Sequence, residues 1–189
     1  LLHDSAKRFE NPVMLQKCLD RGIPVTAEEE RDPSLLHAKL GAWMAENKYG
    51  VDDPEILSAI TCHTTGKPGM SLLDKILYVA DYIEPRRSKA ANLPEMRKLA
   101  FIDLDQACFE IMESILEYLK STGCQIDPMT EAACQDMHRV VSEKQKETAG
   151  AAGETDQDKE EQSVESVKRN GKTCSRGFGR EKRRRRKNY

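Results

Sequence analysis

Up to about residue 129, apolar residues recur every three or four positions, and the alternating pattern typical of β-strands is almost absent. This spacing places apolar side chains on one face of a helix. The longest such stripe consists of Leu104, Cys108, Ile111, Ile115 and Leu119. Shorter stripes precede it, so the pattern predicts an all-α fold in which several helices share one core.

The ends of the predicted helices are marked by capping residues, prolines and glycines. Three Asn-Pro or Asp-Pro pairs each predict an N-cap followed by the first residue of a helix. The predicted starts are Asn11-Pro12, Asp32-Pro33, Asp53-Pro54, Ser71 and Pro94, and the predicted ends are near Gly22, Gly50, residues 64–69 and Pro85. The segment from Pro94 onward is expected to form one long helix or a pair.

The composition changes after Met129. From Thr130 onward the chain is rich in Glu, Lys, Gln, Gly, Ala, Ser and Arg and has few large apolar residues. Such a segment buries too little apolar surface to offset the entropy lost on ordering. We therefore expect a compact helical domain over residues 1–129 and a disordered charged tail over residues 130–189.

The two parts also differ in charge. Residues 1–129 carry 15 basic and 21 acidic side chains, whereas residues 130–189 carry 15 and 11. The basic excess is concentrated in residues 168–189, which contain 11 Lys or Arg and one Glu. Such a run is typical of contact with nucleic acid or with a membrane surface, and a solvated extension explains it equally well.

The six cysteines form no CxxC pair, and no segment is long and apolar enough to predict a membrane span. Cysteines scattered along helices behave as small apolar residues of a reduced protein. These features predict a cytoplasmic protein and leave its oligomeric state open.

Three ionisable residues, His37, His63 and Asp81, fall on or beside the apolar stripes of separate predicted helices. One such histidine alone is more often a hydrogen-bonded core residue. The three together with the adjacent pair His3-Asp4 form a cluster of metal-ligand types, and no other cluster competes with it. Imidazole and carboxylate without paired thiolates suit iron, manganese or zinc.

Basic residues accompany this predicted cluster. Lys7 lies one turn after His3-Asp4, and Arg86 and Arg87 follow Asp81 within two turns. Each cation alone is best explained as part of a solvated surface. Beside a metal, however, they would attract a phosphate-bearing substrate, so the residues predict a metal-dependent phosphohydrolase.

Four motifs together resemble the YqeK type of HD-domain phosphohydrolase. They are His3-Asp4-x-Ala6-Lys7, Leu36-His37-Ala38, His63-Thr64-Thr65-Gly66-Lys67-Pro68-x-Met70 and Ala80-Asp81-Tyr82-Ile83-Glu84-Pro85-x-Arg87. The resemblance covers residues 1 to about 129, and its last two motifs are specific. It implies a symmetrical bis(5′-nucleosyl)-tetraphosphatase, which cuts diadenosine tetraphosphate in the middle into two ADP.

The resemblance also assigns roles to residues. It makes His3, Asp4 and Asp81 metal ligands, with iron the expected metal and manganese or another divalent ion as alternatives. It makes Asp4, His37 and His63 catalytic, and it leaves open whether the two histidines hold a second metal. The substrate-binding residues that it implies are Lys7, His37, His63, Thr64, Asp81, Arg87, Gly123, Cys124, Gln125, Ile126, Asp127 and Pro128.

The mechanism implied has Asp4 orienting a water activated by the metal, while Lys7 and Arg87 neutralise phosphate oxygens. His37 or His63 would give a proton to the leaving oxygen. The family also has a metal-binding histidine on a helix upstream of the His-Asp pair, and this chain begins after that helix. We therefore expect the chain as given to bind metal and turn over weakly.

The sequence leaves two alternative functions open. The chain could be another HD-domain phosphohydrolase acting on a different nucleotide or a cyclic dinucleotide. It could also be a non-catalytic nucleotide-binding module whose tail binds nucleic acid, although the intact His and Asp residues argue against a decayed site.

Overall fold

The computed structural model describes residues 2–170, with side chains described as far as residue 149. Its helices are α1 (Asn11–Leu19), α2 (Ala27–Arg31), α3 (Leu36–Tyr49), α4 (Pro54–Cys62), α5 (Leu72–Tyr82), α6 (Leu93–Leu99), α7 (Leu104–Thr122) and α8 (Pro128–Asn170), with a 3-10 turn at Pro33–Leu35. The described residues contain no strand. The all-α prediction is therefore confirmed.

Most helices begin at the caps that the sequence predicted. Asp53 accepts hydrogen bonds from the first N–H groups of α4. Ser71 caps α5, where the Asp74 carboxylate accepts a hydrogen bond from the Ser71 N–H and completes a capping box. Asp32 caps the 3-10 turn rather than α3 itself. The start of α1 differs by one position, because Asn11 is already helical and the preceding residue takes the N-cap.

Helix α2 was not predicted. Its five residues are one alanine, three glutamates and one arginine, so no apolar spacing marks it. It is held by a capping box in which Thr26 and Glu29 exchange side-chain and backbone hydrogen bonds. Glu29 also pairs with Lys39 of α3 at 2.8 Å. The Thr-x-x-Glu spacing was the one sequence signal for this helix.

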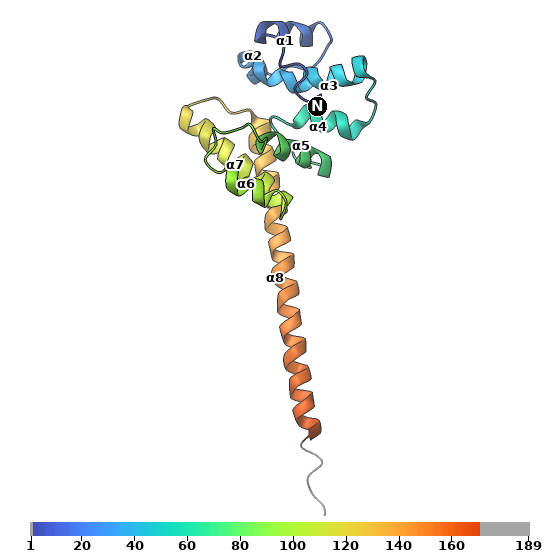
Figure 1. The fold of residues 1–189 in the computed structure, drawn as a ribbon, viewed down its shortest axis with the longest axis vertical. Helices are drawn as coiled ribbons and strands as arrows, with labels where there is room; N and C mark the ends of the chain where they lie inside the picture. Colours follow the sequence, from blue (N-terminus) through green and yellow to red (C-terminus); the bar gives the residue numbers. More distant parts are fainter. Residues whose placement is uncertain (1, 171–189) are drawn as a thin grey trace, which may run out of the picture. The chain divides into compact units, whose positions relative to one another are not determined.

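Helices α3, α4, α5 and α7 pack in succession, with α1 against α3 and α6 against α7 (Figure 1). Cys18, Leu40 and Met44 belong to a core cluster between α1 and α3. A larger cluster, which includes Val79 and Ile111, joins α5, α6 and α7. The α3–α4–α5 succession carries His37, His63 and Asp81 on neighbouring elements, and this arrangement positions the candidate site.

The compact part of the chain extends beyond Met129, so the predicted boundary is wrong. Residues 1–144 form one compact unit. The first turns of α8 bury Ala133, Cys134, Met137 and Val141, and the first three of these belong to the core of α5 and α7. The apolar residues of this segment are few but recur at helical spacing, which an average over the whole tail conceals. Residues 171–189, and with them most of the predicted basic end, lie outside the described residues.

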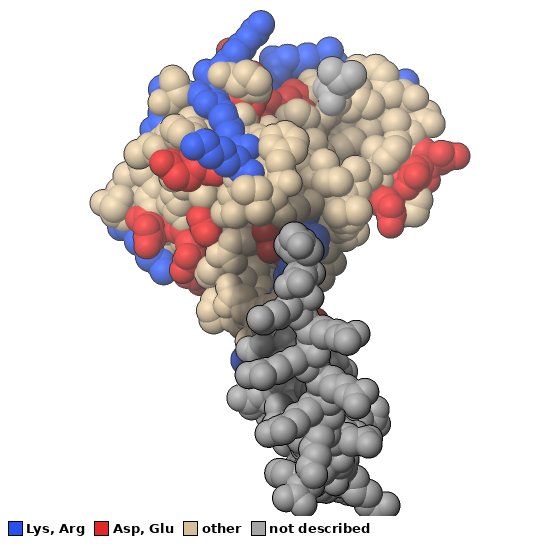
Figure 2. Space-filling view, turned by 60° about the horizontal axis from the view of Figure 1, so that its bottom comes forward, with Lys and Arg blue, Asp and Glu red and all other residues tan. Residues whose placement is uncertain are grey.

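On the face drawn in Figure 2, basic and acidic side chains are interspersed among other residues. In that view several basic side chains lie together toward the top, and acidic side chains lie at both sides. Among the helices of residues 2–170, none is both long enough and apolar enough to cross a membrane.

Candidate metal centre

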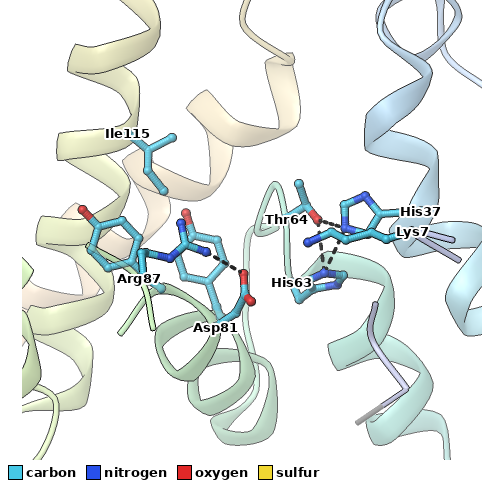
Figure 3. A pocket seen from close by; sticks show the side chains of 9 residues that line it. Lys7, His37, His63, Thr64, Asp81, Arg87 and Ile115 are labelled. Carbon is cyan, nitrogen blue, oxygen red and sulfur yellow. Dashed lines mark hydrogen bonds and ion pairs between the residues drawn. The ribbon is translucent and has the colours of Figure 1, made fainter. Parts of the chain in front are cut away.

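A small cavity of about 230 Å³ lies where the turn at residues 3–8, α3, α4 and α5 meet. Figure 3 shows how its side chains face one another across this space. The residues that line it are Lys7, His37, His63, Thr64, Tyr78, Asp81, Tyr82, Arg87 and Ile115. Six of these nine were candidates from the sequence, although they lie as far apart in the chain as Lys7 and Arg87.

His3 and Asp4 lie in a turn-rich segment that is held closely against α3. Ala6 of this segment is fully buried. A Cβ atom at Gly41 of α3 would lie 3.0 Å from the carbonyl oxygen of His3, tighter than ordinary packing allows. A glycine at this position therefore lets the His-Asp pair approach the helix.

The two buried histidines direct the same ring atom toward each other. His37 Nδ1 lies 2.6 Å from the carbonyl oxygen of Ser34, and His63 Nδ1 lies 2.7 Å from that of Ile60. Because a carbonyl only accepts, each Nδ1 carries the proton and donates it. The two Nε2 atoms are 3.1 Å apart, and the Thr64 hydroxyl lies 3.1 Å from the first and 3.4 Å from the second. One hydroxyl proton can satisfy only one of them.

The carboxylate of Asp4 lies between the histidines, and its two oxygens face different rings. Oδ1 is 3.7 Å from His37 Nε2 and 3.5 Å from His63 Nε2, whereas Oδ2 is 3.5 Å from His3 Nε2. His3 Nε2 is also 3.5 Å from Asp81 Oδ1. The five metal-ligand candidates of the sequence are therefore brought together around Asp4.

The hydrogen bonds of this cluster are incomplete. His3 Nδ1 is buried and makes no hydrogen bond within the described residues. The two oxygens of Asp4 have the partly exposed ammonium of Lys7 as their donor, at 2.8 and 3.0 Å. The ligand atoms of His3, Asp4 and His63 all lie within 4.8 Å of one another. Lone pairs of imidazole and carboxylate that converge in this way are costly unless a cation satisfies them together. The residues thus fit a divalent metal ion.

Burial and charge set the protonation of these groups. Burial raises the pKa of Asp4, but the hydrogen bond and charge of Lys7 outweigh it, and the net pKa is lowered from 3.8. Burial lowers the pKa of both His37 and His63 below 6.5, and their hydrogen bonds to carbonyls oppose this only in part. At neutral pH the site therefore presents an anionic carboxylate and two neutral imidazoles.

Two cations flank the carboxylates. Lys7 Nζ lies 2.8 Å from Asp4 Oδ1. Arg87 Nη2 lies 3.4 Å from Asp81 Oδ2, and a dashed line marks this pair in Figure 3. Both side chains are partly exposed, at 49% and 41%. The Arg87 guanidinium also lies 5.4 Å from the ring centroid of Tyr82. These cations are free to exchange a carboxylate for a phosphate oxygen at the edge of the cavity.

A tight turn after α4 positions Thr64 beside the histidines. Gly66 donates its N–H to the carbonyl of Cys62 at 2.8 Å and has a φ of 70°. A Cβ atom there would lie 2.7 Å from Met112 Cε and 2.9 Å from Ala133 Cβ. Because any other residue would clash with the core, the glycine of the His-Thr-Thr-Gly motif is a requirement of packing.

The predicted nucleotide segment at residues 123–128 does not line this cavity. Gly123 caps α7, Cys124 and Gln125 are exposed, and Ile126 packs against the core. Asp127 and Pro128 instead line a second cavity of about 210 Å³, which Thr64 and Lys39 also line. The structure therefore brings two of the six residues beside Thr64 and leaves the others away from both spaces.

Three residues of the cavity wall were not predicted. Tyr78 and Tyr82 of α5 and Ile115 of α7 line it, and the Tyr78 hydroxyl is buried without a hydrogen bond in the described part of the chain. Tyr82 belongs to the fourth motif, which was a usable signal. The sequence signal at Tyr78 and Ile115 is helical spacing of apolar residues. This spacing does not distinguish a residue that lines a cavity from a core residue.

Comparisons with known proteins agree with this geometry. A profile of the HD domain matches residues 1–86. The chain is 38% identical over 130 residues to the symmetrical bis(5′-nucleosyl)-tetraphosphatase of Bacillus subtilis, which covers 69% of each protein. It is 40% identical over 98 residues to the protein of the same name from Halalkalibacterium halodurans, which covers 52% of each.

A solved structure is also similar. It is the crystal structure of a predicted HD superfamily hydrolase involved in NAD metabolism from Clostridium acetobutylicum, 35% identical with a TM-score of 0.70. The match covers 74% of this chain and 73% of that one. Together with the relative that is 38% identical over two thirds of its length, these findings confirm the resemblance seen in the sequence. The chain belongs to the HD-domain hydrolase family that includes the symmetrical bis(5′-nucleosyl)-tetraphosphatases.

Proposed function

We propose that this chain is a metal-dependent hydrolase that cuts diadenosine tetraphosphate in the middle and releases two ADP. The observation that carries the proposal is the convergence of His3, Asp4 and His63, with their ligand atoms within 4.8 Å, beside the cations Lys7 and Arg87. The names of the relatives from B. subtilis and H. halodurans supply the substrate.

His3, Asp4 and Asp81 would hold the metal, and the Nε2 atom of His63 is a further ligand within reach. When bound, a divalent metal would lower the pKa of a water molecule and polarise a phosphoryl oxygen. Iron is the expected metal from the resemblance, and the His and Asp ligands also suit manganese.

The side chains of the site have distinct proposed tasks. Asp4 would orient the attacking water through a carboxylate oxygen, and Lys7 and Arg87 would neutralise phosphate oxygens as charge moves to the leaving ADP. His37 and His63 are neutral and their Nδ1 protons are engaged by carbonyls. This supports roles as metal ligands or proton acceptors rather than the proton donation that we expected from the sequence.

Incubation of the chain with diadenosine tetraphosphate and Fe²⁺ or Mn²⁺, followed by chromatography of the products, tests the proposal. We expect ADP as the single nucleotide product, and no turnover with excess chelator. Formation of ATP and AMP, or turnover that survives metal removal, would contradict it. The variant Asp4→Asn, measured in the same assay, tests the central carboxylate. Asp52→Asn is its matched control, because Asp52 is an exposed carboxylate outside the cluster.

NAD is a second candidate substrate. The solved relative from C. acetobutylicum is named for NAD metabolism, and NAD also joins two nucleosides through phosphates. The same assay with NAD, and with a cyclic dinucleotide, separates these possibilities. Faster release of AMP from NAD than of ADP from diadenosine tetraphosphate would replace the proposed substrate while keeping the hydrolase.

A further inference from the structure

A third and larger cavity, of about 650 Å³, adjoins the candidate metal centre. Tyr82, Arg87 and Ile115 line both spaces, so the two share a wall. The cavity lies within the size range typical of small-molecule sites. Apart from these three shared residues, the proposed chemistry uses none of the side chains that line it.

The walls of this cavity combine two aromatic side chains, Tyr82 and Tyr118, with several cations. Tyr118 of α7 is 66% exposed and stands one turn after Ile115, which makes an apolar face with an accessible ring. Arg86, Arg87 and Lys89 are exposed on the loop that forms another part of the lining. An aromatic platform beside basic side chains is the pattern that binds a base and the phosphates attached to it.

The loop that carries these cations is held in place. The Arg97 guanidinium donates hydrogen bonds to the carbonyls of Ile83, Glu84 and Arg87 at 2.9 to 3.1 Å. At the far end of the loop, the Tyr82 hydroxyl donates to Asn92 Oδ1 at 2.8 Å. These hydrogen bonds fix the loop that lines the cavity, and a wall that is already fixed lowers the entropy lost on binding.

The central cavity has a neighbouring space on each side. Thr64 is shared with the 210 Å³ cavity that Asp127 and Pro128 line, and Arg87 is shared with the 650 Å³ cavity. A substrate cut in its middle has a nucleoside at each end and needs a place for both. Resting on the proposed function, we propose that the cavity of Arg86, Lys89 and Tyr118 binds the second nucleoside of a dinucleoside polyphosphate, with its base against Tyr118 and Arg87 on the phosphates between.

The test compares ligands with one and two nucleosides. Both are used as analogues with a methylene group at the central bridging position, so neither is cut: one is diadenosine tetraphosphate and the other is adenosine 5′-tetraphosphate. Calorimetry measures each Kd for the wild-type chain and for Tyr118→Ala. We expect the two-ended ligand to bind about ten-fold more tightly to the wild type, and Tyr118→Ala to remove this advantage, since stacking on one ring has about that value.

Controls separate stacking from other effects. Tyr118→Phe keeps the ring and should keep the advantage, and Tyr49→Ala removes a comparably exposed tyrosine at the end of α3 and should leave both affinities unchanged. Equal affinities of the two analogues for the wild type, or an equal loss of both in Tyr118→Ala, would overturn the proposal.

Turnover of unmodified diadenosine tetraphosphate by the wild type is measured separately. If both analogues bind with the expected ratio and the substrate is not cut, the proposed activity fails and the second nucleoside site stands. If the substrate is cut and the ratio is absent, the activity stands and the second site fails.

Discussion

Two polar clusters are built on neighbouring elements, and they differ in how their hydrogen bonds are satisfied. In the structural cluster of Ser58, Lys67, Ser71 and Asp74, the fully buried Asp74 accepts from Ser58 Oγ and the Ser71 N–H, both at 2.8 Å, and pairs with Lys67 at 3.0 Å. Lys67 also donates to the Ser58 hydroxyl. Each carboxylate oxygen of Asp74 therefore meets a donor within the protein.

The metal cluster of His3, Asp4, His37, His63 and Asp81 lacks this balance. The neutral imidazoles of His37 and His63, together with the carboxylates, offer more acceptors than the nearby donors can satisfy. His3 Nδ1 is left without a hydrogen bond in the described part of the chain. Buried polar groups are almost always paired in a structure that serves stability alone. Because its hydrogen bonds are complete, we assign the structural cluster to stability. Because its acceptors are not satisfied, we assign the metal cluster to cation binding.

Removing the central carboxylate of the metal cluster should have the largest effect. Asp4→Asn keeps the shape but removes the charge that faces three imidazoles, so we expect turnover to fall at least about 10³-fold. Unfolding of the metal-free chain should change by less than about 1 kcal/mol, because Asp4 is 37% exposed. Steady-state rates and urea unfolding measure the two quantities. Rates near those of the wild type would contradict the assignment.

The reverse result is expected in the structural cluster. Asp74→Ala leaves Lys67 without its buried partner, and the free energy of unfolding should fall by about 3 to 5 kcal/mol. Turnover per folded molecule should stay within about two-fold, because Asp74 is not in the metal cluster. Asp52→Ala on an exposed carboxylate is the control, with an expected change under about 0.5 kcal/mol. An equally small change for Asp74→Ala would remove the contrast.

A smaller effect is expected from the backbone contact that places the His-Asp pair. Gly41→Ala puts a Cβ atom 3.0 Å from the His3 carbonyl oxygen. Metal affinity should therefore weaken about ten-fold, as it does when residues that orient metal ligands are changed. Alanine is the better helix former by about 1 kcal/mol, so helix propensity cannot explain a loss. Titration with Mn²⁺ measures the affinity. An unchanged Kd would show that the pair is not positioned by α3.

The smallest effect concerns pH. Burial lowers the pKa of His37 and His63 below the unfolded value of 6.5. Below pH 6.5 the unfolded chain therefore binds more protons than the folded chain, and stability falls as the pH falls through this window. Urea midpoints of the metal-free chain between pH 8 and 5 should show this loss, and the double variant His37→Gln/His63→Gln should show less of it. Identical pH profiles would contradict the neutral state of these rings.

The sequence predicted the helices and the convergence of the site because both depend on local rules. Asp53 and Ser71 cap α4 and α5 as expected, since capping needs only neighbouring backbone groups. Helical spacing fixed the side of each helix on which His37 and His63 lie. Because this helical bundle has few inward-facing His and Asp side chains, those side chains become one another's partners.

Other features depend on contacts that spacing does not encode. In α5, Ala80 is exposed, whereas Tyr78, Val79 and Tyr82 are buried. The face of α5 is chosen by its packing on α7 rather than by its own apolar count. Arg97, which holds the cation-bearing loop, donates its hydrogen bonds to backbone carbonyls. Because every residue has a carbonyl, the sequence does not reveal these hydrogen bonds.

We expect a cation to complete the metal cluster, whereas the structural cluster is complete without one. Calorimetric titration of the metal-free chain with Mn²⁺ tests this difference, with Asp4→Asn and Asp74→Asn beside the wild type. We expect saturable binding by the wild type and by folded Asp74→Asn, and loss of that binding in Asp4→Asn. Binding by Asp4→Asn as tight as that of the wild type would contradict it.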